Sequence, residues 1–273
     1  MSQKTDEFEN NLKTTIRSFA GLALPTNIPR WIEELGISAN DRITNAVKVG
    51  SVGHKTDIII YINNRPCLKV SAKMSSADYF GNWYSHQRII REFGSDLFQK
   101  LTKDCTEWAN SWIDSDNASL FVGVSISFGK RTGGTAREFT DIFTADDIVK
   151  IVAGVGNGIE TANCLYSSSM LPNSIDDLFQ ILKPIDTNTI MQLSKNFKII
   201  YRPINPLTEG SNRGKCTYTQ FKPCQSYQPR KTVKTLNDLK KLGKFYEVTD
   251  NGLNHNRILD SLEDEYNIFI PRK

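Results

Sequence analysis

One short stretch of the chain holds residue types that could hydrolyse a phosphate ester. Within residues 50–74, Asp57 begins the apolar run DIIIYI, and Ser71 and Lys73 end the next run, CLKVSAKM. The β-branched residues and the NNRP turn between the runs predict two antiparallel strands. Such a hairpin brings Asp57 and Lys73 to the same end of a sheet, and residues two apart, such as Ser71 and Lys73, share a face.

A carboxylate, a hydroxyl and an ammonium group around one point suit the cleavage of a phosphodiester. The reaction needs a cation that offsets the charge of the transition state and an activated water in line with the scissile bond. Asp57 would hold Mg²⁺, which takes few carboxylates and keeps several waters. Lys73 would orient or deprotonate the attacking water. The alternative is that both residues are solvated groups at strand ends.

The string K-T-D, a strand, a turn and a second strand ending in S-A-K resembles the PD-(D/E)XK nuclease superfamily, and most of all its type II restriction endonucleases. In the family's pattern the first Asp corresponds to Asp57, the (D/E) position to Ser71 and the Lys to Lys73. The resemblance therefore implies that these three residues are catalytic. Lys55, two residues before Asp57, also matches several restriction enzymes and is expected to contact DNA. The resemblance covers residues 50–74 closely and the flanking helices loosely.

The chain departs from the family's pattern at Ser71, where the family usually has an acid or an amide. Without a carboxylate there, the metal ion loses a ligand. The resemblance implies that another acid replaces it, and Asp78, beside the helix expected to follow, is the preferred second metal ligand. Glu92 further along, and Glu33 or Glu34 from an N-terminal helix, are the alternatives. Asp78 could instead be a helix N-cap.

These residues need a framework of helices and a sheet. Residues 1–45 have apolar positions at helical spacing with a proline break, and residues 79–101 are also expected to be helical. The run LFVGVSISF at residues 120–128 predicts a buried strand. Further helices are expected at 146–155 and 174–182, and further strands at 197–204, 215–223 and 244–248. The pattern predicts an α/β or α+β fold, with a mixed central sheet flanked by helices and a β-rich, basic C-terminal half.

The net charge of +4 is unevenly distributed along the chain. Residues 195–245 contain twelve Lys or Arg and two acids, so this segment carries +10 and the remainder carries −6. Such a segment, interleaved with aromatic residues, suits a surface that neutralises phosphates, and a solvated basic face is the alternative. We therefore expect a catalytic core over residues 1–190 and a basic DNA-recognition region over 191–273, or a single domain.

Two loops in particular have the composition of DNA contacts. GKRTGGTAREF, at residues 129–139, contains Arg131 and a flexible Gly pair. SNRGKCTYTQFK, at residues 211–222, offers Asn212, Arg213, Lys215 and Lys222 around an expected strand. Arginine bound to guanine is the commonest specific contact to a base, so we expect these residues to bind DNA.

The composition also excludes several classes of protein. Five widely spaced cysteines without a C-x-x-C pair argue against a disulfide framework or a structural zinc site. The chain has no apolar run long enough to span a membrane and a polar N-terminus, so we expect a cytoplasmic protein without membrane contacts. A nucleotide-binding phosphotransferase would require a helix after Thr56, where a strand is expected.

The expected function follows from the resemblance. It implies a type II restriction endonuclease that uses Mg²⁺ to hydrolyse double-stranded DNA at specific sequences and leaves 5′-phosphates. It also implies a cognate DNA methyltransferase, and either a homodimer or a monomer. Another nuclease of the same superfamily, for repair or nicking, is one alternative. A DNA-binding protein without catalysis is the other, since Ser71 could mark a degenerate site.

Overall fold

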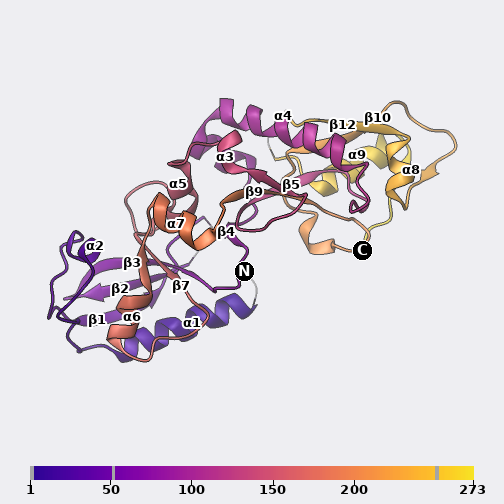
Figure 1. Ribbon diagram of the computed structural model, residues 1–273. Coiled ribbons are helices and arrows are strands. Elements are labelled where there is room, and N and C mark those ends of the chain that lie inside the picture. The colour runs from indigo at the N-terminus through magenta and orange to yellow at the C-terminus, as the bar shows by residue number, and fades with distance from the viewer. Residues whose placement is uncertain (1–2, 51–52, 250–251) are drawn as a thin grey trace. The chain divides into compact units, whose positions relative to one another are not determined.

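The computed structural model describes residues 3–50, 53–249 and 252–273, and the chain divides into two compact units (Figure 1). Unit 1 comprises Met1–Phe80 and Ala145–Phe197, and unit 2 comprises Gly81–Thr144 and Lys198–Lys273. Each unit is thus built from two separate stretches of the chain. The boundaries between the units fall after residues 80, 144 and 197, whereas the sequence predicts one boundary near residue 190.

Unit 1 is built on a mixed five-stranded sheet in the order β1-β2-β3-β7-β8. Its strands are β1 (Ile43–Lys48), β2 (Ile58–Ile62), β3 (Arg65–Lys73), β7 (Cys164–Ser167) and β8 (Leu182–Pro184). The first three strands run antiparallel, β7 runs parallel to β3, and β8 runs antiparallel to β7. The hairpin predicted over DIIIYI and CLKVSAKM is therefore confirmed. The strand after Thr56 is the one that the sequence predicts, and residues 51–52 before it lie outside the described residues.

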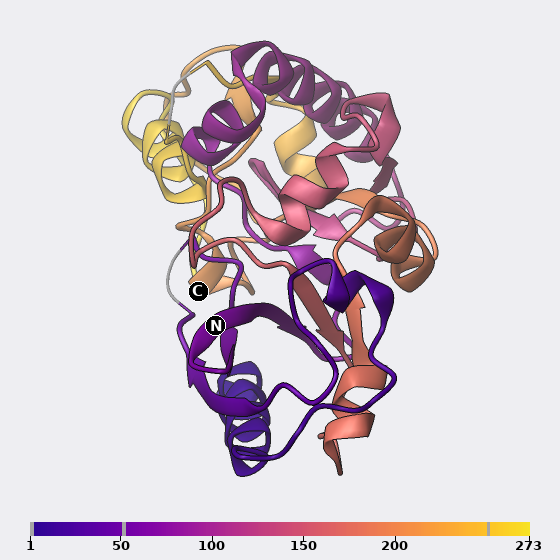
Figure 2. The ribbon, with the colours of Figure 1, turned by 90° about the vertical axis from the view of Figure 1, so that its left-hand side faces the viewer.

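Helix α1 (Gln3–Ser18) covers one face of this sheet (Figures 1 and 2). Leu12 and Ile16 on the helix pack into one core with the strand residues whose side chains point toward it, which are Ile58, Ile60, Ile62, Leu68, Val70 and Ala72. The alternation of β2 and β3 sends the intervening residues to the other face. Ser71 and Lys73 therefore lie on the face opposite to α1.

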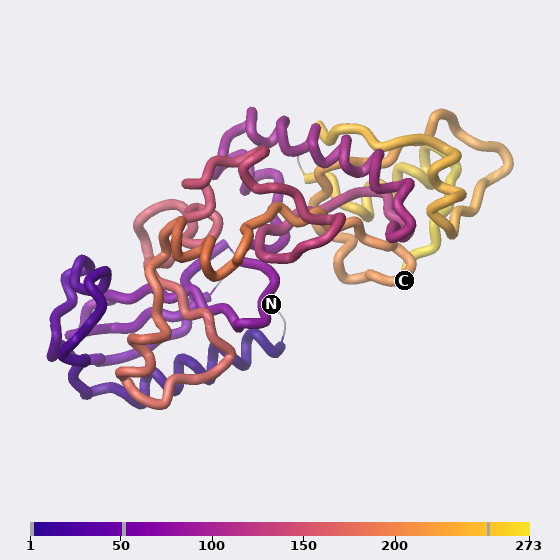
Figure 3. Tube along the Cα trace, in the orientation of Figure 1, coloured from indigo at the N-terminus to yellow at the C-terminus, as the bar shows by residue number. Residues whose placement is uncertain are grey.

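The rest of unit 1 comes from the second stretch of the chain, which runs beside the first (Figure 3). The second stretch forms three short helices, α5 (Asp147–Ala153), α6 (Ile175–Ile181) and α7 (Thr187–Ser194). The first stretch contributes one more short helix, α2 (Arg30–Glu33). Ser174 and Asp186 cap α6 and α7 through their side-chain oxygens. The helices expected at 146–155 and 174–182 are thus confirmed.

Unit 2 contains short strands and the longest helix of the described residues. Its helices are α3 (His86–Phe93), α4 (Ser95–Trp112), α8 (Leu236–Lys240) and α9 (His255–Asp264). A four-stranded sheet has the order β4-β5-β9-β6, with β4 (Tyr79–Gly81), β5 (Val124–Gly129), β6 (Ala136–Glu138) and β9 (Lys198–Pro203). Two further pairs are β10 (Thr219–Pro223) with β12 (Gly243–Glu247), and β11 (Lys231–Thr232) with β13 (Ile268–Phe269). The chain is therefore a mixed α/β protein with several sheets.

The prediction of a helix over residues 79–101 is wrong for residues 79–85. Tyr79–Gly81 is strand β4, and α3 begins after Ser85, whose hydroxyl accepts from the Arg88 amide. Gly94, with φ of 90°, then separates α3 from α4. The aromatic residues at 79–84 fit a strand edge as well as a helix, and a glycine at positive φ interrupts the helical path.

In the described ranges, no helix has both the length and the apolar character that a membrane crossing requires.

Candidate active site

Asp57 lies directly before β2 and is held by the neighbouring strand β3. Its amide donates to the Val70 carbonyl at 2.8 Å, and its Oδ2 accepts from the Ala72 amide at 2.8 Å. The residue is 7% exposed. The backbone of β3 therefore fixes this carboxylate at the end of the sheet.

Lys73 ends β3 and completes a charge pair with Asp57. Its Nζ lies 3.3 Å from Asp57 Oδ2 and donates to the Ala72 carbonyl at 3.0 Å. Ser71, two residues earlier, is fully buried, and its hydroxyl has no hydrogen-bond partner among the described residues. The hairpin thus brings Asp57 and Lys73 together, in the arrangement that their spacing in the sequence predicts.

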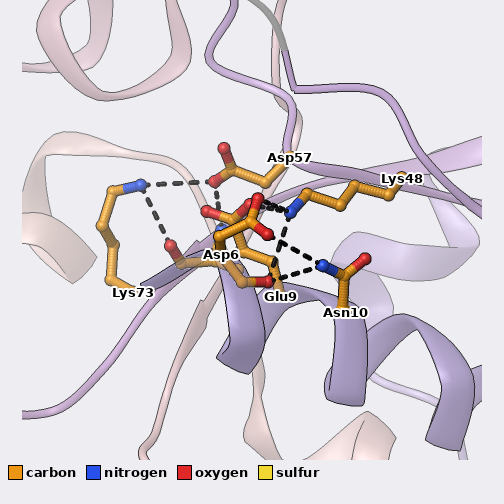
Figure 4. A network of polar contacts seen from close by, with 7 residues as sticks. Asp6, Glu9, Asn10, Lys48, Asp57 and Lys73 are labelled. Atoms are coloured by element: carbon orange, nitrogen blue, oxygen red, sulfur yellow. Dashed lines mark hydrogen bonds and ion pairs between the residues drawn. The ribbon is translucent and has the colours of Figure 1, made fainter. Parts of the chain in front are cut away.

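Glu9 on α1 brings a second carboxylate to this place (Figure 4). It is 1% exposed, and its Oε2 lies 3.1 Å from Nζ of Lys48, the last residue of β1. Lys48 also donates to Oδ1 of Asp6 at 2.6 Å. Figure 4 shows these carboxylates gathered with Asp57 between two amines. Three acids and two lysines therefore form one network at this end of the sheet.

The charges of the network influence one another. Burial raises the pKa of the Glu9 carboxyl, and the negative charge of Asp57 raises it further, while Lys48 and Lys73 act in the opposite direction. For Lys48, burial alone would lower the pKa, but Asp6 and Glu9 outweigh it and the pKa is raised. Two carboxylates that repel each other favour a bound cation, since a cation offsets both charges.

Asp57 and Glu9 fit the ligand preference of Mg²⁺. This ion is usually held by one or two carboxylates, and water and substrate oxygens complete its shell. The buried Glu9 carboxylate lies in an ion pair with Lys48, whose ammonium group offsets its charge. Over residues 3–50, 53–249 and 252–273, no three His, Cys, Asp or Glu side chains are grouped as ligands of one metal ion.

The acids that the sequence suggests as second ligands belong to other elements than Asp57 and Lys73. Asp78 is exposed, in the segment between β3 and β4. Glu92 belongs to unit 2, where its Oε1 accepts from Arg88 at 2.8 Å. Glu33 and Glu34 are exposed at α2, which precedes the start of β1, whereas Asp57 lies at the other end of the sheet. Asp78 stays a prediction, and Glu9 is an acid of unit 1 on which the charges of Asp57 and Lys73 act.

Only a weak signal in the sequence pointed to Glu9. It lies three residues before Leu12 and seven before Ile16, on the stripe that α1 buries. An acid on a buried helical stripe is uncommon, because a buried charge is costly unless it is paired. That position could have singled out Glu9, but its nearness to Asp57 depends on how α1 packs on the sheet.

The residues predicted to contact DNA lie in two kinds of environment. Lys55 in unit 1 is 8% exposed, and its Nζ donates to the Phe80 carbonyl at 3.4 Å. The others lie in unit 2, and they are Arg131, Asn212, Arg213, Lys215 and Lys222. Arg131 and Lys222 are exposed.

Contacts within unit 2 hold the remaining predicted residues. Asn212 donates to Glu209 at 3.2 Å, and Arg213 donates to Asn256 at 3.1 Å. Lys215 is half-buried and has its Nζ 5.7 Å from the centroid of the Trp83 ring. Their contacts to DNA stay predictions.

The prediction that aromatic residues of the basic segment form part of a phosphate-binding surface is wrong for three of them. Tyr201, Tyr218 and Phe221 are at most 2% exposed and belong to the core of unit 2. Strand β9 is buried on both faces at residues 198–201, which include Tyr201. Phe221 lies on the buried face of β10, and Tyr218 directly precedes that strand. The composition of the segment therefore reflects a core and a basic surface, and only the surface is available to a ligand.

No protein-family model, curated protein or solved structure matches this chain.

Proposed function

We propose that this protein is a Mg²⁺-dependent nuclease that cleaves double-stranded DNA at specific sequences, as type II restriction endonucleases do. The observation that carries the proposal is the Asp57–Lys73 pair, with 3.3 Å between Nζ and Oδ2, on adjacent strands of a mixed sheet. The buried carboxylate of Glu9 supports the proposal, because the charge of Asp57 acts on it and it would give the metal ion a second carboxylate.

Each residue of the site has a part in this reaction. Asp57 and Glu9 would hold Mg²⁺, which when bound supplies positive charge to the scissile phosphate. Lys73 Nζ would orient the attacking water by a hydrogen bond and offset the charge that develops on the phosphate. The Ala72 backbone fixes both Asp57 and Lys73, so the pair needs little reorganisation when substrate binds.

The resemblance of residues 50–74 to the PD-(D/E)XK superfamily supports the finer assignment. It implies a restriction-endonuclease-like core, cleavage that leaves 5′-phosphates, a homodimer or a monomer, and a partner DNA methyltransferase. The mixed sheet of unit 1, covered by α1 and carrying Asp57 and Lys73 at a strand end, suits that core. Unit 2 contains residues 198–245 of the basic segment and would recognise the DNA.

Digestion of a long unmethylated DNA with Mg²⁺ tests the proposal. We expect discrete fragments from the wild type, and no fragments from Asp57→Ala or Lys73→Ala. Lys69→Ala is the matched control, because Lys69 lies on the same face of β3 and its Nζ donates to the Gly158 carbonyl at 2.8 Å. This variant should cut like the wild type.

The pattern of products separates the alternatives. A smear would indicate a nuclease without sequence specificity, and a single nick in supercoiled DNA would indicate a nicking enzyme. Intact DNA that nevertheless binds the protein would indicate a DNA-binding protein without catalysis.

A further inference from the structure

Trp83 in unit 2 has an unusual backbone conformation. Its φ is 50°, a left-handed region that bulky side chains rarely adopt. The Trp83 amide donates to the Ser127 hydroxyl on β5 at 3.2 Å, which fixes the residue. Residues in this region persist where the surrounding structure holds them, and they are found preferentially at functional sites.

The guanidinium of Arg202, a residue of β9, lies over the Trp83 ring. The Arg202 carbon Cζ lies 3.5 Å from the ring centroid, and Nη1 donates to Asn82 Oδ1 at 2.8 Å. The Ser127 hydroxyl also donates to Asn82 Oδ1, at 2.9 Å. The ring fixes the plane of the guanidinium and Asn82 fixes its direction, so Arg202 is held in one orientation.

Lys215 adds a second cation to the same ring, with Nζ 5.7 Å from the centroid. Asn82 is exposed, and Trp83, Arg202 and Lys215 are each partly exposed. Both cations belong to the basic segment 195–245. We define Asn82, Trp83, Arg202 and Lys215 as the Trp83 cluster.

We propose that the Trp83 cluster binds the sugar-phosphate backbone of DNA. This inference rests on the proposed function, because DNA is the ligand that it assigns. A guanidinium held flat can donate two parallel hydrogen bonds to a phosphate, and a lysine adds a point charge. Because Trp83 and Asn82 already order Arg202, little side-chain entropy is lost when the phosphate binds. The contact is to the backbone, so it strengthens binding to every sequence alike.

Binding to a labelled duplex, measured by fluorescence anisotropy without divalent metal, tests the cluster in the full chain. Arg202→Gln removes the charge and should raise Kd by about 5- to 10-fold at low salt, on cognate and unrelated duplexes alike. It should also reduce the slope of log K against log salt by about 1. Trp83→Gly removes the ring, while the positive φ suits glycine, so it should weaken binding and leave Tm unchanged or higher.

Arg230→Gln is the matched control. Arg230 also lies over an aromatic ring, 4.5 Å from the centroid of Phe269, and it is ion-paired with Glu263, which offsets its charge. Its loss should change Kd less than twofold. Wild-type affinity in both Arg202→Gln and Trp83→Gly, or an equal loss in Arg230→Gln, would overturn the inference.

The same measurements separate this inference from the proposed function. If the wild type cleaves DNA and the cluster variants have an unchanged Kd, the Trp83 cluster is not a DNA contact and the nuclease proposal stands. If binding weakens in the cluster variants but the wild type does not cleave DNA in Mg²⁺, the nuclease proposal is rejected and the cluster stands as a DNA contact. A wild type that binds no duplex would overturn both.

Discussion

Glu9 shows how a single buried charge can complete a site. Helix α1 buries Leu12 and Ile16 on the same stripe, so an acid at this position has no reason to be there for packing alone. Its pairing with Lys48 offsets part of the cost of burial. A cation bound near Asp57 and Glu9 would offset the repulsion between their two carboxylates, which gives a reason for the acid at position 9.

Replacing Glu9 with Gln keeps the shape of the side chain and removes its charge. We expect Glu9→Gln to fold and to cleave DNA about 10- to 100-fold more slowly, with a higher Mg²⁺ concentration at half-maximal rate, because the metal loses a charged ligand. A titration of cleavage rate against Mg²⁺ measures both effects. Glu33→Gln, at an exposed acid of α2, is the control and should behave like the wild type. Equal rates in the two variants would exclude Glu9 from the site.

His255, the first residue of α9, makes the stability of unit 2 depend on pH. Burial lowers its pKa from 6.5 to about 3, and its Nε2 lies 2.9 Å from the Ser125 hydroxyl. The folded protein therefore keeps this ring neutral, while the unfolded chain takes up a proton below pH 6.5. Stability from this residue is present above pH 6.5 and is lost as the pH falls toward 3.

We expect His255→Phe to remove this dependence. The wild type should lose on the order of 4 kcal/mol through this residue alone between pH 6.5 and 3, and the variant should lose correspondingly less. Urea unfolding followed by circular dichroism at pH 7, 6, 5 and 4 gives the two slopes. Parallel slopes would show that His255 titrates in the folded protein as it does in the unfolded chain.

At the scale of elements, strands were predicted well where their pattern is local. The β2–β3 hairpin needs only alternation and a turn within residues 57–73, so the sequence predicts both the strands and the meeting of Asp57 with Lys73. The aromatic residues at 79–84 suit either a helix or a strand edge. Strand β4 forms there because β5 offers a partner, and no local pattern shows this.

Gly243 fixes the pairing of β10 with β12. It pairs with Pro223, and a Cβ added to it would overlap the carbonyl oxygen of Lys222, which belongs to the backbone. We expect Gly243→Ala to destabilise the protein by about 1–3 kcal/mol, since a strand must shift. Thermal unfolding measures the loss.

Gly214→Ala is the control for this effect. Apart from Gly214 itself and its two chain neighbours, no heavy atom of the described residues lies within 4 Å of the Cβ that would be added there. The substitution should be neutral or slightly stabilising, because alanine restricts the unfolded chain. An equal loss in both variants would mean that the hairpin does not depend on close approach at Gly243.

At the scale of the whole molecule, each unit combines two stretches that are separated in the chain by a stretch of the other unit. The first stretch of unit 2, residues 81–144, lies in the chain between strands β3 and β7 of unit 1. The second stretch begins at residue 198 with strand β9. Strand β9 lies between β5 and β6. A fragment that stops before β9 therefore leaves the edge of β5 without its partner.

This arrangement predicts the behaviour of a fragment of residues 1–190. We expect it to bind a hydrophobic dye and to self-associate, because β5 and the apolar residues that face β9 become exposed. Dye fluorescence and light scattering, with the full chain as the control, test this expectation. A monomeric fragment with a cooperative unfolding transition would show that residues 1–190 form an independent domain.

The sequence alone determined the Asp57–Lys73 hairpin, the mixed α/β class and the uneven charge, because each depends on neighbours in the chain or on composition. Only the tertiary structure decided that Lys48 pairs with Glu9 within reach of the charge of Asp57, and that Asn82 and Trp83 contact Arg202. These contacts join segments far apart in the chain. They depend on which faces of helices and strands pack together, and local periodicity leaves that choice open.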